Sequence, residues 1–104
     1  MIEYTVKVFP DGGYACYLDD ELHCEHGPAI VGSDGSREWW FRGLLHREGG
    51  PAVEHTDGTK YWYLHGKLHH EDGPAVERAD GIKQWWLNDK GLTEEEHRQY
   101  VLTL

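Results

Sequence analysis

The fold is decided by residues 57–79, which read DGTKYWYLHGKLHHEDGPAVERA. The stretch before them, residues 34–56, reads DGSREWWFRGLLHREGGPAVEHT and is identical at 12 of 23 positions. Asp-Gly recurs at positions 11, 34, 57 and 80, and Gly-Pro-Ala at positions 27, 50 and 73, always 23 residues apart. A fixed period of this length is the signature of a repeat protein.

The period predicts a single domain made of repeats. Residues 1–10 are predicted to form a cap strand, and three full repeats cover residues 11–33, 34–56 and 57–79. Residues 80–104 hold a degenerate fourth repeat followed by a capping helix. A chain of 104 residues is too short for several domains or for an enzyme with a large cavity.

Each repeat is predicted to form antiparallel β-structure. The Asp-Gly pair predicts a two-residue hairpin turn in which both residues take positive φ. Strands rich in aromatic residues follow at 36–41, 59–64 and 82–87. Second turns are expected at Arg42-Gly43, His65-Gly66 and Asn88-Asp89, before a return path that Gly-Pro interrupts. We therefore expect a mostly β fold, an elongated antiparallel sheet of 23-residue β-hairpin repeats with a short C-terminal capping helix.

Both ends of the sheet are predicted to be capped. Residues 2–9 resemble the last strand of a repeat and are expected to cover the N-terminal edge. At the other end, Thr93 and Glu96 predict a capping box at the start of a helix over residues 94–101. This helix is expected to lay Tyr100, Val101 and Leu104 over the last strand.

Residues 62–76, WYLHGKLHHEDGPAV, resemble the MORN repeat, a β-hairpin unit of similar length with an Asn-Gly-Lys-type turn. They are closer still to the MORN-variant repeats of small bacterial and phage proteins, some of which are antitoxin-like. The resemblance covers about residues 11–92 and implies an elongated, twisted antiparallel sheet that serves as a scaffold for diverse partners. The association of eukaryotic MORN proteins with acidic lipids is not carried over, because this chain is itself acidic.

The charge of the chain excludes several classes of partner. Nineteen acidic and ten basic residues give a formal charge of −9, which argues against direct binding to nucleic acid or to an anionic membrane. No bilayer-spanning apolar run and no signal peptide is expected, and Cys16 and Cys24 lack the spacing of a zinc or redox motif. We expect a cytoplasmic protein of a bacterial host cell, a monomer or homodimer, that uses no cofactor.

The residue pattern predicts neither catalysis nor metal binding. His-x-Glu recurs at His23, His46 and His69, but equivalent positions of neighbouring repeats lie about 10 Å apart and cannot share one metal ion. We expect each of these histidines to bond a backbone group at the Gly-Pro break, with the glutamate as its local partner. Ser33 and Ser36 flank a turn without an elbow motif, so the chain is predicted not to be an enzyme.

Two rows of side chains alternate along the repeated strand. The first row holds Cys16, Trp39, Trp62 and Trp85, with Leu18, Phe41, Leu64 and Leu87 two residues further on, and is interpreted as core. The second row holds Tyr17, Trp40, Tyr63 and Trp86. This second row is either a structural aromatic ladder or an exposed stripe that anchors a protein interface.

The predicted partner-binding residues are Tyr17, Trp40, Tyr63, Trp86, Glu25, Glu48 and Glu71. Glutamates about 10 Å apart are too sparse to imitate DNA phosphates by themselves, but an acidic surface can attract a basic protein. The hypothesis is a non-enzymatic protein-binding module that acts by steric and electrostatic occlusion. It would inhibit a host defence protein, such as a CRISPR effector, or neutralise a toxin. The alternatives are a nucleotide or sugar binder that uses the aromatic stripe, and a self-assembling structural protein.

Overall fold

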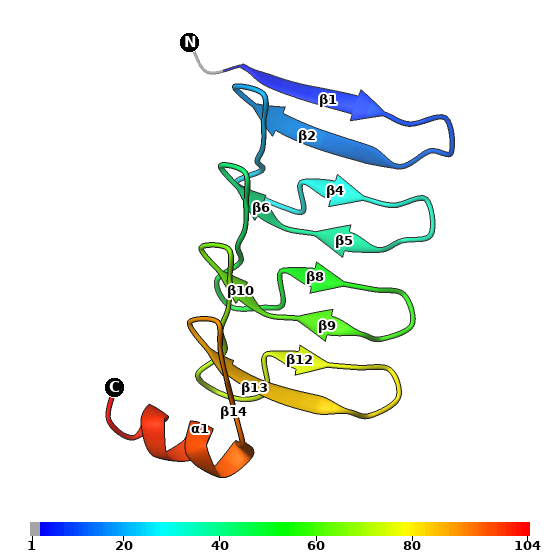
Figure 1. Ribbon diagram of the computed structural model, residues 1–104. Helices are drawn as coiled ribbons and strands as arrows, with labels where there is room; N and C mark the ends of the chain where they lie inside the picture. Colours follow the sequence, from blue (N-terminus) through cyan, green and yellow to red (C-terminus); the bar gives the residue numbers. More distant parts are fainter. Residues whose placement is uncertain (1–2) are drawn as a thin grey trace.

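The structure is a row of β-hairpins that ends in one helix (Figure 1). It is a computed structural model that describes residues 3–104, so the first two residues of the predicted cap strand lie outside the described residues. The strands are β1 (Tyr4–Val8), β2 (Tyr14–Leu18), β3 (Glu21–Leu22), β4 (Ile30–Val31), β5 (Arg37–Glu38), β6 (Trp40–Phe41), β7 (Leu44–Leu45), β8 (Val53–Glu54), β9 (Lys60–Tyr61), β10 (Tyr63–Leu64), β11 (Lys67–Leu68), β12 (Val76–Glu77), β13 (Lys83–Leu87) and β14 (Lys90–Leu92). The helix α1 covers Glu94–Val101. The predicted fold class, a mostly β chain of antiparallel hairpins with one short C-terminal helix, is confirmed.

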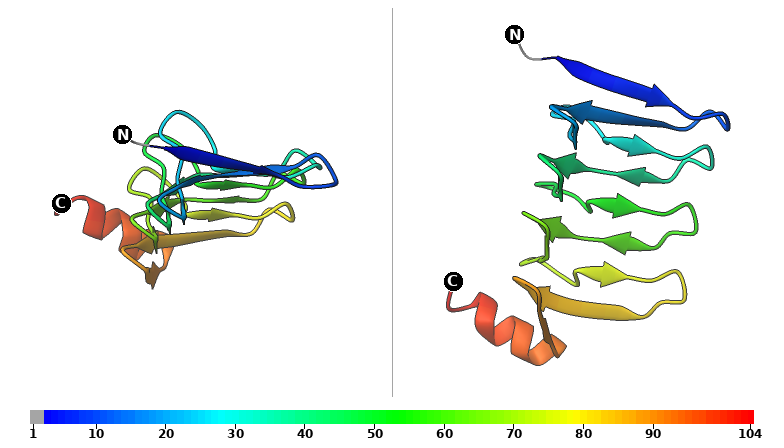
Figure 2. Two further views of the ribbon diagram at one scale, coloured as in Figure 1. Left: turned by 90° about the horizontal axis from the view of Figure 1, so that it is seen from above. Right: turned by 45° about the horizontal axis from the view of Figure 1, so that its top comes forward.

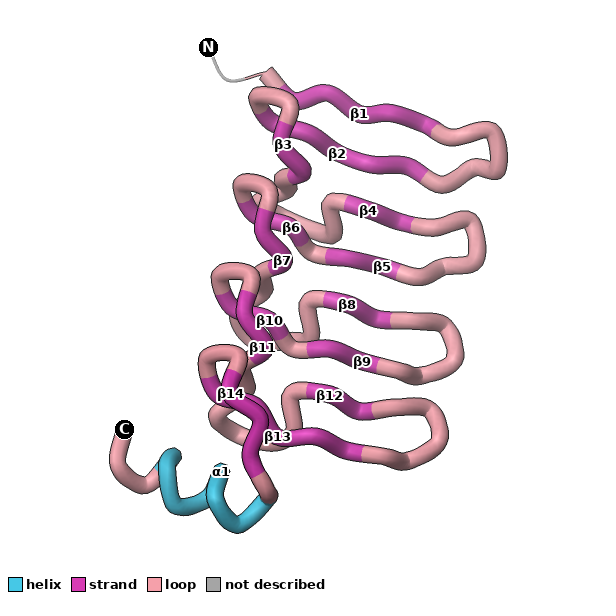
Figure 3. Tube along the Cα trace, in the orientation of Figure 1, coloured by secondary structure: helices cyan, strands magenta, loops and turns pink. Residues whose placement is uncertain are grey.

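The main sheet runs through all the repeats in the order β1-β2-β4-β5-β8-β9-β12-β13-β14, and every neighbouring pair is antiparallel. The predicted strands 36–41 and 59–64 are each interrupted, at Trp39 and at Trp62. The first half of each belongs to the main sheet, and the second half pairs within a separate hairpin, β6–β7 or β10–β11 (Figure 3). Figure 2 shows these small hairpins turning out of the layer of the main sheet. The molecule is thin, with extents of 44 × 34 × 17 Å.

The two kinds of turn differ from each other. The expected second turns are confirmed as two-residue turns with positive φ at both positions, for example 50° at His65 and 79° at Gly66. The prediction of a two-residue Asp-Gly turn is wrong. At residues 55–59 the His55 N–H donates to the Thr59 carbonyl (2.9 Å) and the Gly58 N–H to the His55 carbonyl (3.1 Å), which makes a three-residue loop with only the glycine, at φ 97°, in the left-handed region. The Asp57 carboxylate favours this loop because it accepts the Thr59 N–H at 2.9 Å.

The core is built from small side chains. Ala29, Ala52 and Ala75, one in each repeat, are completely buried, and Val53 and Val76 are nearly so. The interpretation of the first aromatic row as core holds for the residues of the first repeat, Cys16 and Leu18. It is wrong for the later repeats, where Trp39, Trp62 and Trp85 are half-buried and Phe41 is 44% exposed. A layer only 17 Å thick has no interior deep enough to enclose an indole.

The helix begins and ends where the sequence predicts. Thr93 Oγ1 accepts the Glu96 N–H at 3.1 Å, and the Glu96 carboxylate accepts the Thr93 N–H at 2.9 Å, which completes the capping box. Two of the expected contact residues do face the last strands: the Tyr100 hydroxyl accepts from Lys90 Nζ of β14 at 3.2 Å, and Val101 is half-buried near Trp85 of β13. The expectation is wrong for Leu104, which is exposed. The buried side chain of α1 is instead His97, whose Nε2 lies 2.6 Å from the His70 carbonyl.

Candidate functional site

A histidine at the same position of each repeat joins that repeat to the next one. The Nδ1 atoms of His23, His46 and His69 each accept a main-chain N–H from 19 residues further on, at 2.9, 2.9 and 3.0 Å. The donors are Arg42, His65 and Asn88, the first residues of the positive-φ turns. The expectation that these histidines bond the backbone is confirmed, but its location at the Gly-Pro break is wrong, because the group lies in the following repeat.

In the second and third repeats, the residue after the joining histidine makes a hydrogen bond to the Gly-Pro segment of its own repeat. Arg47 donates from Nη1 to the Pro51 carbonyl at 3.1 Å and to the Glu54 carboxylate at 2.8 Å. One repeat later, the His70 Nδ1 lies 2.9 Å from the Pro74 carbonyl. The second and third repeats therefore each use two successive side chains for two hydrogen-bonded contacts, one to the next repeat and one within their own loop. The first repeat has Cys24 at the second of these positions.

We refer to His23, His46 and His69, which bond to the next repeat, as the joint histidines. The glutamates of the His-x-Glu element are their local partners, as expected. Because Nδ1 accepts a hydrogen bond, the neutral imidazole carries its proton on Nε2. The Nε2 atoms of His23, His46 and His69 lie 3.5, 4.0 and 3.4 Å from the carboxylates of Glu25, Glu48 and Glu71. The three glutamate side chains are 50, 85 and 55% exposed, so each carboxylate lies near its histidine and still meets solvent. Of the three, Glu71 is within hydrogen-bond distance of its histidine.

Aromatic rings from successive repeats follow one another along the array. The ring centroids of Tyr4 and His23 are 6.1 Å apart, those of His23 and Phe41 4.4 Å, those of Phe41 and His46 5.9 Å, and those of His46 and His65 4.3 Å. Burial and the charge of His65 lower the pKa of His46, against the opposing effect of Glu48. The lowered pKa favours the neutral form of His46, which accepts the His65 N–H at Nδ1.

Two equivalent grooves open between the repeats. The first has a volume of about 600 Å³ and is lined by Glu25, Trp39, Phe41, His46 and Glu48, among others. The second lies one repeat further on, has a volume of about 320 Å³, and is lined by the corresponding Glu48, Trp62, Leu64, His69 and Glu71. The repeated glutamates therefore stand in grooves that also hold an indole ring.

The indole in each groove is covered by the residue eight positions later. The Arg47 guanidinium lies 3.8 Å from the ring centre of Trp39. The His70 ring is stacked on Trp62 with a centroid distance of 3.6 Å and an angle of 6°. These stacks fix the orientation of two large aromatic surfaces and leave them half-buried.

In the fourth repeat, the helix α1 lies where the first two grooves are open. Trp85 corresponds to Trp39 and Trp62, and it lines a space of about 390 Å³ together with His97, Arg98 and Val101 of the helix. The same part of the fold is thus open to solvent in two repeats and faced by a helix in the last one (Figure 1).

The predicted binding residues do not form one site. Tyr17, Trp40, Tyr63 and Trp86 are all half-buried. Trp40 donates its indole N–H to Glu38 at 2.9 Å, and Trp86 donates to Gln84 at 3.3 Å. The residues that line the two grooves include the glutamates Glu25, Glu48 and Glu71 with Trp39 and Trp62, whereas Trp40 and Tyr63 belong to neither groove. In the described residues, the acids and the second aromatic row are therefore separated.

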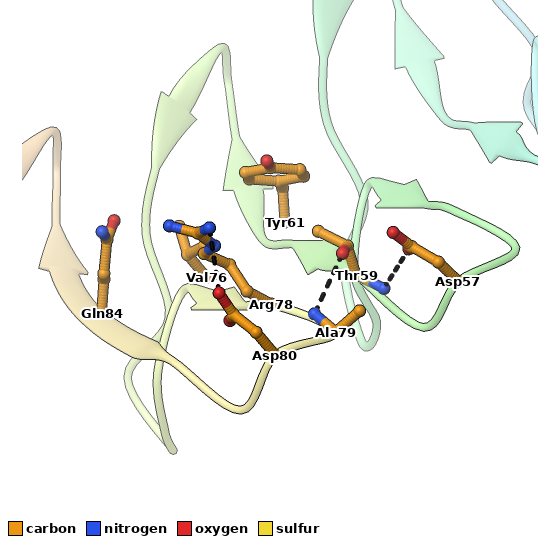
Figure 4. Close-up of a pocket in the computed structure, with 8 residues that line it drawn as sticks. All are labelled: Asp57, Thr59, Tyr61, Val76, Arg78, Ala79, Asp80 and Gln84. Carbon is orange, nitrogen blue, oxygen red and sulfur yellow. Dashed lines mark hydrogen bonds and ion pairs between the residues drawn. The ribbon is translucent and has the colours of Figure 1, made fainter.

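A further hollow of about 530 Å³ lies between the loops of the third and fourth repeats (Figure 4). Arg78 and Asp80 form an ion pair of 3.0 Å there, and Thr59 Oγ1 accepts the Ala79 N–H at 3.1 Å. Together with the bond from the Thr59 N–H to Asp57, these contacts engage the charged residues of the hollow within the fold itself.

The sequence reasoning missed Trp39, Trp62, Arg47 and His70 as surface residues. A signal was present, because an arginine and a histidine at one repeat position are unusual neighbours for a core tryptophan. Alternation along a strand identifies residues that share a face but does not show how deeply that face is covered.

Residues 3–104 contain no group of three or more His, Cys, Asp or Glu side chains arranged to hold a metal ion. Within the same range, no helix is long and apolar enough to cross a membrane. No family model, curated protein or solved structure matches the chain.

Proposed function

We propose that this chain is a non-enzymatic protein-binding module that inhibits a basic protein by occluding its surface. The observation that carries the proposal is the row of exposed glutamates Glu25, Glu48 and Glu71, each within 4.0 Å of a joint histidine and each lining a groove that also contains a half-buried ring. Carboxylates at a regular spacing attract a basic surface and raise the association rate. Trp39 and Trp62 supply the aromatic area that dominates interface energies.

The partner class is a basic protein of a bacterial cell, namely a nucleic-acid-binding defence effector or a toxin. The formal charge of −9 supports this class because it favours partners of opposite sign and disfavours direct contact with nucleic acid. In this proposal the protein acts in the cytoplasm, as a phage-type inhibitor or as an antitoxin. The relationship to MORN-variant repeats is part of the same proposal, and one hairpin with a positive-φ turn in every 23 residues supports it.

The test is a tagged pull-down from nuclease-treated bacterial lysate, read by mass spectrometry, followed by binding measurements on the captured protein. We expect one stoichiometric basic protein. The triple variant Glu25→Gln, Glu48→Gln, Glu71→Gln should weaken its binding at least tenfold, about 1.4 kcal/mol, and reduce the salt dependence of the association rate.

The matched control removes three charges elsewhere, with Asp19→Asn, Asp20→Asn and Glu94→Gln. Equal losses in the two triple variants would mean that only net charge matters, and the grooves would not be the binding site. Capture of nothing but a small molecule would replace the proposal with the ligand-binding alternative.

A further inference from the structure

The outer edge of β1 has unpaired main-chain groups. In residues 3–104, β1 pairs with β2 on one side and has no strand on the other (Figure 1). The Cys16 N–H bonds to the Ala29 carbonyl on the far side of β2, so the Val6–Cys16 pair is of the kind that does not exchange hydrogen bonds. The N–H and C=O groups of Val6, and by alternation those of Tyr4 and Val8, therefore point outward from the sheet.

The side chains of the same three residues form an exposed apolar row. Tyr4, Val6 and Val8 are 44, 57 and 73% exposed. The residues opposite them on β2 are Leu18, Cys16 and Tyr14, so no charged side chain interrupts this face of the hairpin. The charged residue of β1, Lys7, projects from the other face, where its Nζ lies 4.9 Å from the centre of the Tyr17 ring.

We propose that β1 pairs with β1 of a second copy of this chain, antiparallel and around a two-fold axis at Val6. In this register Val6 meets Val6 of the second copy, and Tyr4 meets its Val8. The outward N–H and C=O groups of these residues then bond to one another, as β-augmentation requires. The apolar rows of the two copies become one surface, and each Lys7 faces a threonine.

The opposite end of the sheet explains why the second copy pairs through β1. The alternative contact would join β13 of one copy to β1 of another, in the register that β9 and β12 have within the sheet, where Lys60 lies opposite Glu77. In that register, Val8 of one copy would lie opposite Lys83 of the other. This contact sets an apolar side chain against an ammonium group, whereas in the contact through β1 each apolar residue of the row meets another apolar residue. The contact through β1 is isologous and closes at two copies. Because its axis is perpendicular to the sheet, both copies present their grooves on the same face.

The experiment is light scattering coupled to size exclusion, with analytical ultracentrifugation for the dissociation constant. The wild-type chain is expected at twice 12.0 kDa. Val6→Pro removes only an N–H that points outward, so the hairpin's own ladder is kept and the mass is expected to fall to one copy. Val6→Thr keeps the N–H and the β-branched shape and should retain the dimer, and Lys83→Pro at the opposite edge should also leave it intact.

Val6→Lys provides a second route if Val6→Pro does not fold by circular dichroism. It keeps every main-chain group but sets two ammonium groups side by side on the axis, so it should also run as one copy. A wild-type chain that stays at 12.0 kDa at about 1 mM protein overturns the proposal. It is also overturned if Val6→Lys stays dimeric, or if the mass grows beyond two copies and Lys83→Pro stops that growth.

Discussion

At the scale of the residue, the joint histidines explain how repeats with so little buried volume hold together. His23 is 1% exposed and is the largest completely buried side chain in the described residues. Its Nδ1 accepts the N–H of Arg42, a turn residue whose N–H has no partner in a neighbouring strand. A hydrogen bond of this kind contributes about 1 kcal/mol net, and leaving the buried group unpaired costs about 1–3 kcal/mol. Three such joints therefore matter in a molecule whose core is mostly alanine and valine.

The joint at His46 makes stability depend on pH. Burial and His65 lower the pKa of His46 in the folded protein, whereas the unfolded value is about 6.5. The unfolded chain therefore binds more protons as the pH falls below about 6.5, and the free energy of unfolding decreases on the acid side. His46→Asn keeps an acceptor for the His65 N–H and does not titrate. Urea titrations from pH 7 to pH 5 should show a smaller loss in this variant than in the wild type, and equal losses would contradict this prediction.

At the scale of the element, the positive-φ turns are built from unequal residues. The first turn residue has φ 48° at Arg42 and 49° at Asn88, nearly the same conformation. An asparagine tolerates this region, whereas a long side chain is penalised by about 1–2 kcal/mol. The conformation at Arg42 is maintained because its N–H is bonded to His23 at 2.9 Å.

Exchange of the two residues tests this strain. Arg42→Asn should raise the free energy of unfolding by about 0.5–1 kcal/mol, and Asn88→Arg should lower it by a similar amount. Neither change removes the main-chain bond to His23 or His69. The measurement is urea unfolding followed by circular dichroism. Changes of the same sign would show that side-chain contacts, rather than φ, decide these positions.

The elements divide into those that the sequence predicts and those that it does not. The repeat boundaries and α1 follow from short-range signals, namely the 23-residue period and the Thr93–Glu96 capping box. The sequence does not predict the interruption of strand 36–41 at Trp39. It arises because the two halves of this strand pair in two different hairpins, β4–β5 and β6–β7. The bond from Arg42 to His23 was missed for a related reason, since spacing within one repeat does not show which group the next repeat brings near.

At the scale of the whole molecule, stability comes from equivalent contacts between neighbours. The pairs β5–β8 and β9–β12 have the same register, and the joints at His23 and His46 have the same length. In such an array the free energy of unfolding is close to a sum of repeat terms and interface terms. The chain should therefore tolerate loss of one complete repeat.

Deletion of residues 34–56 tests this additivity. The shortened chain would bring His65 to His23 in place of Arg42 and should fold with a single transition. Its urea m-value is expected to fall by about a fifth, in proportion to the surface removed. Deletion of residues 34–44, which breaks the period, serves as the control and should leave the chain unfolded. If both deletions unfold the chain, the repeats are not interchangeable.

The joints have a consequence for how such a protein can change over time. Each histidine grips the main chain of the neighbouring turn, and the residues at that position are an arginine, a histidine and an asparagine. The hydrogen bond between repeats therefore does not depend on the side chain at the turn. A mutation there changes the stability of its own turn through φ but leaves the bond to the preceding repeat in place, so a lineage can vary one turn side chain per repeat on an unchanged backbone.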